Sequence, residues 1–144
     1  LGRQYIQARR FDKARPLLEE AFHRDPSNTR FGIDLCNVLL QGRDYARVKS
    51  IAQPMVREQS RFEFSLVLGQ ACQGLGEFEE AIAQYAEYIT RFGANVQVFN
   101  QIGECYRQLG DSAEALKAWE KSLSLNPKQP DIREKIAALK KSQP

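Results

Sequence analysis

The amino-acid sequence predicts an all-α fold built from stacked helical repeats, and two observations lead to this prediction. Similar residues recur at intervals of about 34 positions, a period typical of stacked supersecondary units. Apolar residues between them are spaced three or four apart, as one face of an α-helix requires. No alternating, strand-like pattern persists for more than a few residues. A single unit of this kind cannot bury its apolar face alone, so we expect the units to stack on one another.

The recurring positions are clearest in the second half of the chain. One copy consists of Leu68-Gly69-x-x-Cys72, Gly76, Ala81 and Tyr85, and the next of Ile102-Gly103-x-x-Tyr106, Gly110, Ala115, Trp119 and Pro127. An earlier copy consists of Leu1-Gly2-x-x-Tyr5, Ala14, Leu18 and Pro26, and a weaker one of Leu35-Cys36-x-x-Leu39, Tyr45, Val48 and Ala52. Because the same residue types return at the same spacing, the chain is expected to contain about four related units.

The pattern Phe99-x-x-Ile102-Gly103-x-x-Tyr106, followed by Ala115-x3-Trp119 and Pro127, resembles that of the tetratricopeptide repeat family. The resemblance extends over residues 1–129 and divides them into units 1–28 (partial), 29–61, 62–95 and 96–129. It implies a right-handed α-solenoid of antiparallel helix pairs, without a cofactor, and with a concave groove that binds peptides.

The first two units depart from the pattern. Leu1-Gly2 falls in the middle of a first helix, so we expect the sequence to be a fragment of a longer array or a larger protein. Pro16 is expected near the start of the second helix of that unit, where proline is tolerated. Pro54 is expected well inside a helix of the second unit, where it should produce a kink.

Glycines are expected to join and to pack the helices of each pair. Gly42-Arg43-Asp44, Gly76-Glu77 and Gly110-Asp111 stand between the helices of a pair, where we expect glycine to take the positive φ of a helix C-cap. Gly69 and Gly103 lie inside helices, where glycine costs about 0.5–1 kcal/mol relative to alanine. We therefore expect a second helix to cross each of them too closely for a side chain.

The last unit and the residues after it predict that the array ends in a capping helix. Residues 112–125 form its second helix, which ends at Asn126-Pro127. Residues 130–141 predict a capping helix with Ile132, Ile136 and Leu139 on one stripe, followed by a tail at 142–144. Arg133 and Lys140 stand where an internal repeat would carry apolar groups. In the core, Tyr85, Tyr106 and Trp119 are predicted to be largely buried between helices.

Composition excludes several classes of protein. The chain is 42% hydrophobic and 27% charged, so disorder is not expected. It contains no run of about 18 apolar residues, so we expect no membrane span in this chain. A net charge of +3 is too small to indicate a nucleic-acid partner by itself.

Residues with catalytic or metal-binding chemistry are few and scattered. The single histidine, His23, has no serine or cysteine at a spacing that suggests a partner. Cys36, Cys72 and Cys105 are too far apart for a zinc knuckle and fall at packing positions, which predicts buried thiols. Phosphate-binding glycine motifs are absent from the sequence. We therefore expect no enzyme, no metal and no cofactor; the compartment stays open, with the thiols only mildly favouring a reducing one such as the cytoplasm.

The resemblance also indicates which residues would line the groove. In the tetratricopeptide repeat family, the first helices line it through residues just beside the core face; here these are Arg30, Ile33, Asn37, Gln41, Leu66, Gln70, Gln73, Gln97, Asn100, Gln101, Glu104 and Gln108. Asparagine and glutamine both donate and accept hydrogen bonds, so they can hold an extended peptide backbone. The alternative is that these amides only keep exposed helices soluble.

One subclass of the family can be tested by residue type. Its clamp for a chaperone's C-terminal carboxylate needs lysine, arginine and asparagine at set positions, which Ile33, Asn37, Val67, Gln97 and Gln101 fill here. Only Asn37 fits and the cations are missing, so we do not expect recognition of such a carboxylate.

The sequence therefore predicts a non-enzymatic scaffold that binds a peptide or helix of a protein partner, within a larger protein or assembly. The partner's identity is not encoded in any motif. Self-association through stacked repeat ends is the first alternative. An RNA-binding helical repeat is a weaker one, because Asp34 and Glu104 face the predicted groove beside few cations, and no nucleic-acid partner is expected.

Overall fold

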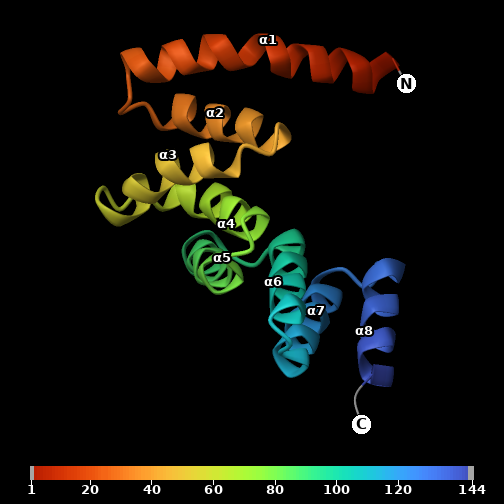
Figure 1. Cartoon of the computed structure of the whole chain (residues 1–144). Helices are drawn as coiled ribbons and strands as arrows, with labels where there is room; N and C mark the ends of the chain where they lie inside the picture. The colour runs from red at the N-terminus through yellow and green to blue at the C-terminus, as the bar shows by residue number, and fades with distance from the viewer. Residues whose placement is uncertain (1, 143–144) are drawn as a thin grey trace. The chain divides into compact units, whose positions relative to one another are not determined.

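The computed structural model describes the backbone of residues 2–142 and the side chains of residues 12–142 (Figure 1). Its regular structure is helical throughout that part of the chain: α1 (Gly2–Arg24), α2 (Thr29–Gln41), α3 (Tyr45–Arg57), η1 (Phe62–Phe64), α4 (Ser65–Gly74), α5 (Phe78–Phe92), α6 (Val96–Gln108), α7 (Ser112–Leu125) and α8 (Pro130–Ser142). The predicted all-α class is confirmed, and α7 has the predicted bounds.

Polar side chains set the starts of four helices. Asn28, Asp44, Asn95 and Asp111 each accept a hydrogen bond from the backbone N–H three residues further on, at donor–acceptor distances of 3.0, 3.4, 3.1 and 3.2 Å. Each bond satisfies one of the N–H groups that a helix leaves unpaired in its first turn. The short polar residues between the apolar stretches therefore determine where α2, α3, α6 and α7 begin.

The turns between paired helices need one residue in the left-handed region. Gly76 and Gly110 take it, with φ of 78° and 80°, as predicted. The prediction for Gly42 is wrong: Gly42 caps α2 with φ of −83°, and Arg43 takes the left-handed conformation with φ of 58°. The glycine of this turn stands one residue too early. Gly42 is the C-cap residue of α2 and thus corresponds to Leu75 and Leu109, which cap α4 and α6 with φ of −84° and −79°.

The helices form two compact units, residues 1–75 and residues 76–144. In the first, α1 to α4 follow one another side by side, and α2 also packs against α4 (Figure 1). Its core holds Leu35, Leu39, Val48 and Leu68, all with no exposed surface. A β-carbon on Gly32 of α2 would lie 2.8 Å from the ring of Phe64, so a missing side chain lets that ring pack.

In the second unit, α6 and α7 form the most extensive helix–helix contact, which centres on Trp119. Trp119 and Tyr85 have no exposed surface, as predicted. A β-carbon on Gly103 would overlap Nε1 of Trp119, well inside van der Waals distance. The predicted close approach at Gly103 is therefore confirmed. Tyr106 is only half-buried, contrary to the prediction, because one side of it faces an open pocket.

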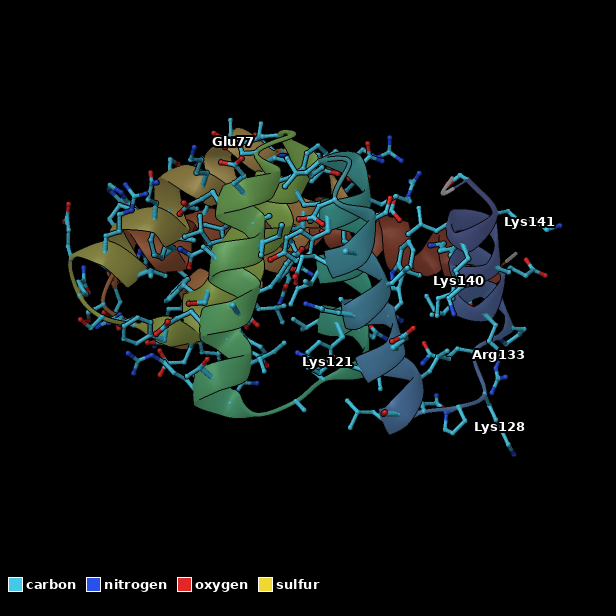
Figure 2. All side chains as sticks on the ribbon, turned by 90° about the horizontal axis from the view of Figure 1, so that it is seen from below. Glu77, Lys121, Lys128, Arg133, Lys140 and Lys141 are labelled. Atoms are coloured by element: carbon cyan, nitrogen blue, oxygen red, sulfur yellow. The ribbon has the colours of Figure 1, made fainter. Side chains whose placement is uncertain are left out.

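The last helix covers the apolar end of this unit. Ile132 and Ile136 are buried in one cluster with Ala115 and Trp119, and Leu139 packs at its edge. Arg133 and Lys140 are exposed on the outer side of this helix (Figure 2), and the guanidinium of Arg133 donates to the backbone oxygen of Pro127 at 3.0 and 3.2 Å. The apolar stripe and the charged outer face predicted for residues 130–141 are thus both present in α8.

The first unit begins with one long helix where the sequence indicates two short ones. Arg9 and Arg10 stand where the last repeat has Gly110 and Asp111, so the left-handed glycine and the capping carboxylate are both missing, and α1 continues from Gly2 to Arg24. Pro16 consequently lies in the helix interior and not near a helix start, contrary to the prediction. Leu1 and the side chain of Tyr5 lie outside the described residues. Pro54 is inside α3, as predicted.

Gly103→Ala provides a test of the contact with Trp119. Helix propensity alone predicts a gain of up to about 1 kcal/mol, whereas the clash with the indole predicts a loss of about 1–3 kcal/mol in the free energy of unfolding. Urea denaturation distinguishes the two signs. Gly42→Ala is the control, since its nearest neighbour would lie 3.7 Å away and it should cost little. A Gly103→Ala protein as stable as the parent would contradict the packing described here.

Arg43→Gly should raise the free energy of unfolding by up to about 1 kcal/mol. A non-glycine residue in the left-handed region costs about 1–2 kcal/mol, and glycine recovers most of it despite its greater freedom in the unfolded chain. The converse change Gly110→Arg should lower stability by a similar amount, because the φ of Gly110 is 80°. Thermal denaturation of both variants tests these two expectations. A melting temperature of Arg43→Gly below that of the parent would be incompatible with this turn geometry.

Candidate protein-interaction surfaces

Helix α6 presents two different surfaces on opposite sides. Successive residues of an α-helix turn by about 100°, so Gln97, Gln101, Glu104 and Gln108 share one side. Phe99, Ile102 and Tyr106 point about 160° away from them on average. We call the first group, with its equivalents on α2 and α4, the amide face, and the hollow over the second group the trough.

The predicted groove residues divide by exposure, and apart from Asn100 they form the amide face. Arg30, Asn37, Gln41, Gln70, Gln97, Gln101 and Gln108 are exposed, and Ile33, Leu66, Gln73, Asn100 and Glu104 are half-buried. On α2 and α4 of the first unit they lie opposite the buried positions Leu35 and Leu68. On α6 of the second unit they lie opposite the trough. Arg30 also lies 3.9 Å from Asp34 in a solvent-exposed ion pair.

Asn100 differs from the other amides, because its side chain belongs to a polar network inside the second unit. Its Nδ2 donates to Oε1 of Gln129 at 2.9 Å, and its backbone oxygen accepts from Nε1 of Trp119 at 3.3 Å. Nε2 of the buried Gln129 donates to the backbone oxygens of Asn126 and Ser122 at 2.8 and 3.2 Å. Gln129 thereby joins α6 to the connection between α7 and α8. Sequence reasoning missed this role, since Gln129 stands outside the repeat pattern.

Glu104 is the charged centre of the amide face on α6. Its carboxylate accepts hydrogen bonds from Nε and from a terminal nitrogen of Arg107, and Nζ of Lys135 lies 3.9 Å away. The hydrogen bonds from Arg107 are the main cause of a lowered pKa for Glu104; partial burial opposes them, and the charges of Arg107 and Lys135 add to them. Glu104 is therefore a carboxylate at neutral pH, and it links α6 to α8 electrostatically.

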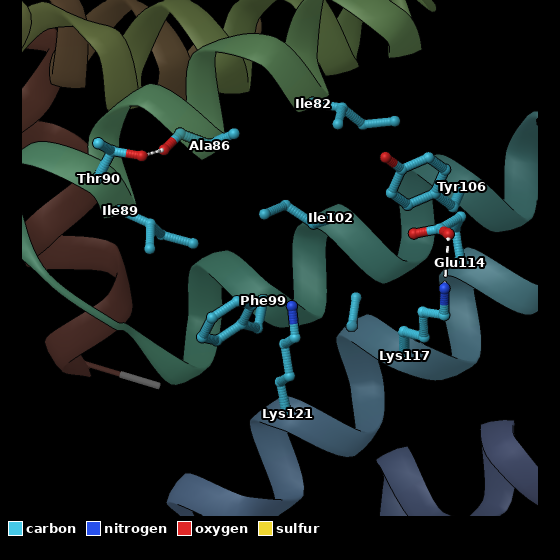
Figure 3. A pocket seen from close by; sticks show the side chains of 11 residues that line it. Ile82, Ala86, Ile89, Thr90, Phe99, Ile102, Tyr106, Glu114, Lys117 and Lys121 are labelled. Atoms are coloured by element: carbon cyan, nitrogen blue, oxygen red, sulfur yellow. Dashed lines mark hydrogen bonds and ion pairs between the residues drawn. The ribbon is translucent and has the colours of Figure 1, made fainter.

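The trough is a hollow of about 310 Å³ between α5, α6 and α7 (Figure 3). Its lining residues are Ile82, Ala86, Ile89, Thr90, Phe99, Ile102, Tyr106, Glu114, Lys117, Ala118 and Lys121. Isoleucine, alanine and phenylalanine form most of it, and charged groups come only from α7. The sequence pattern placed Phe99, Ile102 and Tyr106 at recurring positions of the repeat, but it could not show that α5 and α7 leave α6 open between them.

Charge changes sign along the trough. A second hollow of about 390 Å³ continues from Ile82 and Tyr106, and its lining includes Glu79 and Asp111. Glu114 lies at the Tyr106 end of the trough and bonds to Lys117 at 3.1 Å (Figure 3). Nζ of Lys121 lies at the other end, 5.9 Å from the centroid of the Phe99 ring. One end is thus acidic and the other basic.

The remaining chemically distinctive groups of the described residues are the three cysteines. Cys36, Cys72 and Cys105 are buried, as predicted, and burial raises the pKa of the Cys36 and Cys105 thiols to about 12. In the part of the chain that the structure describes, no group of histidine, cysteine and carboxylate side chains could hold a metal ion. Nor does any described helix combine the length and apolarity needed to cross a bilayer.

Tandem helix pairs, with aromatic rings packed on glycines of neighbouring helices, are typical of a helical-repeat protein. The chain belongs to the tetratricopeptide repeat family, whose family models match residues 5–65, 63–94 and 96–129. Such repeats form scaffolds for protein interactions, and the family is in general not enzymatic. The predicted family is confirmed.

Solved structures of tetratricopeptide repeat proteins share the fold. MamA is 19% identical with a TM-score of 0.77, over 96% of this chain and 82% of that one. TTC0263, a thermophilic tetratricopeptide repeat protein of Thermus thermophilus, is 22% identical with a TM-score of 0.72, over 96% and 77%. MamA AMB-1 is 25% identical with a TM-score of 0.71, over 90% and 71%. No curated protein matches this sequence. The predicted helical solenoid agrees with these neighbours.

The pH dependence of stability should reveal Glu104. Because its pKa is lowered in the folded chain, its contribution is fully present above the ordinary carboxyl range and is lost as pH falls through the folded pKa. Glu104→Gln should be less stable than the parent at pH 7 and should lose less stability on acidification below about pH 5. Glu120→Gln, at an exposed position on α7, is the control. Parallel stability curves for the parent and Glu104→Gln would contradict the electrostatic link.

Proposed function

We propose that this chain is a non-enzymatic scaffold that binds a segment of a partner protein on its amide face, within a larger protein or assembly. One observation supports this most directly: α2, α4 and α6, the first helices whose side chains the structure describes, expose amide side chains on the side away from the core. Asn37 and Gln41 do so on α2, Gln70 on α4, and Gln97 on α6. Within the first unit, the recurrence on α2 and α4 fits a ligand that runs along both helices.

The chemistry of the amide face suits a peptide backbone. Each amide offers two donors and an acceptor, which match the N–H and C=O groups of an extended chain, while Ile33 and Leu66 offer apolar contacts beside them. A net hydrogen bond contributes about 0.5–1.5 kcal/mol, and micromolar affinity needs about 8 kcal/mol, so several amide bonds together with the apolar contacts are expected to give micromolar affinity. Because few charges line the face, binding should depend only modestly on salt.

Self-association is the second candidate, and an exposed leucine favours it. Leu17 on α1 is 69% exposed, more than any other large apolar side chain in the described part of the chain. Stacking of a second molecule on α1 would bury it. Light scattering tests this candidate. An average mass that increases with protein concentration in the parent, and that does not increase in Leu17→Lys, would support self-association. RNA binding is less favoured, because Glu104 places a carboxylate on the amide face of α6.

Site-specific photocrosslinking tests the amide face. A photoreactive amino acid at Gln70 or Gln97 should link the full-length protein to the same partner in its native cells, and one at the exposed Glu120 of α7 should not. The double variant Asn37→Ala/Gln70→Ala should then bind the purified partner at least about tenfold more weakly, since it removes two amide contacts. Asn100 is left unchanged, because its bond to Gln129 would confound binding with folding.

Circular dichroism and thermal denaturation of the double variant provide the folding control. Crosslinks that arise equally from Glu120, or a folded double variant that keeps full affinity, would exclude the amide face as the binding site.

A further inference from the structure

We infer that the trough is a second docking site, and that it takes an amphipathic helix of a protein partner with an acidic first turn and a basic last turn. The inference depends on the dimensions, the lining and the charge order of the trough. It does not depend on the amide face, because that face lies on the opposite side of α6.

The length of the trough fits two turns of a helix. Its walls run from Ile82 to Thr90 on α5 and from Glu114 to Lys121 on α7, and its floor runs from Phe99 to Tyr106 on α6. At a rise of about 1.5 Å per residue, each of these stretches is about 10–12 Å long. Two helical turns of a partner have the same length, so apolar residues three and four apart would each face the floor.

The lining leaves room for inserted side chains. Ala86 on α5 and Ala118 on α7 face the hollow from opposite walls, and both are small. Ile82, Ile89, Phe99 and Ile102 supply apolar surface between them (Figure 3). An apolar floor between small residues on the two walls is the form of groove into which an amphipathic helix inserts its apolar stripe.

The order of charges gives the bound helix a direction. Lys121 stands at the Phe99 end. At the Tyr106 end Lys117 offsets Glu114, to which it bonds, and Glu79 and Asp111 supply the negative charge. Complementary charges require acidic residues of the partner near Lys121 and basic residues near Glu79. Helices favour acidic residues in their first turn and basic ones in their last. The partner helix therefore starts beside Lys121 and runs antiparallel to α7, which proceeds from Asp111 to Lys121.

The experiment uses a synthetic probe. The probe is a fluorescent helical peptide of about 15 residues, with glutamates in its first turn, leucines spaced three and four apart, and lysines in its last turn. A second peptide has the same composition with the lysines first and the glutamates last. Fluorescence anisotropy with the full chain should show the first peptide binding with micromolar affinity and the second binding at least about threefold more weakly.

Two variants locate the binding in the trough. Ala86→Phe fills the hollow and should weaken the first peptide at least about tenfold, whereas Ala83→Phe, an exposed alanine on α5 outside the lining, should not. Lys121→Glu should weaken the first peptide and strengthen the second, about threefold each. Thermal denaturation shows that each variant is folded.

The outcomes separate this inference from the proposed function. Gln97→Ala/Gln108→Ala on the amide face of α6 should leave probe binding unchanged. No measurable binding of the first peptide, equal affinity for both peptides, or binding unaffected by Ala86→Phe in a folded protein would overturn the inference. If Gln97→Ala/Gln108→Ala lost binding of the first peptide while Ala86→Phe kept it, the peptide would bind the amide face, and the inference would also be overturned.

Discussion

The approach of Trp119 to Gly103 is the constraint on which the second unit depends. An indole ring can approach α6 this closely only where α6 has no side chain, and Gly103 is that position. Trp119 then contacts Ala115, Ile132 and Ile136, so the same ring that joins α6 to α7 also forms the surface that α8 covers. Phe64 over Gly32 and Tyr45 over Gly74 follow the same principle in the first unit. A missing β-carbon in one helix thus accommodates an aromatic ring from another.

Because the aromatic packing uses one side of α6, two further sides remain for other roles. Gly103 and Trp119 take one, the amides take a second and the apolar lining of the trough takes a third. Under the proposed function, helix α6 is therefore shared between packing and recognition, and the position of each residue around the helix decides its role more than its polarity does. Asn100 illustrates this, since it is an amide that lies close to the Trp119 side and forms a structural bond to Gln129.

Much of the fold was predictable from the sequence, because repeated residues carry repeated physical roles. The turns at Gly76 and Gly110, the helix over Ser112–Leu125 and the close packing at Gly103 follow from local rules about φ, helix termini and volume. The left-handed Arg43 was missed because a neighbouring glycine suggested the wrong register by one residue. The long α1 was missed because Arg9 and Arg10 lack the signals that stop a helix. The exposed amides were identified through the resemblance to the tetratricopeptide repeat family. The bond of Asn100 to Gln129 and the trough were not predicted, because both depend on distances between segments.

The buried thiols of Cys36 and Cys105 have a consequence for the dynamics of the two units. Each unit holds one of these thiols, and burial keeps both protonated and inaccessible at neutral pH. A thiol reagent can therefore react at either site only while the surrounding helices are transiently open. The rate at Cys36 reports opening of the first unit, and the rate at Cys105 reports opening of the second. Peptide mapping separates Cys36 from Cys72, the other buried thiol of the first unit, and the ratio of the rates at Cys36 and Cys105 measures whether the two units open together or separately.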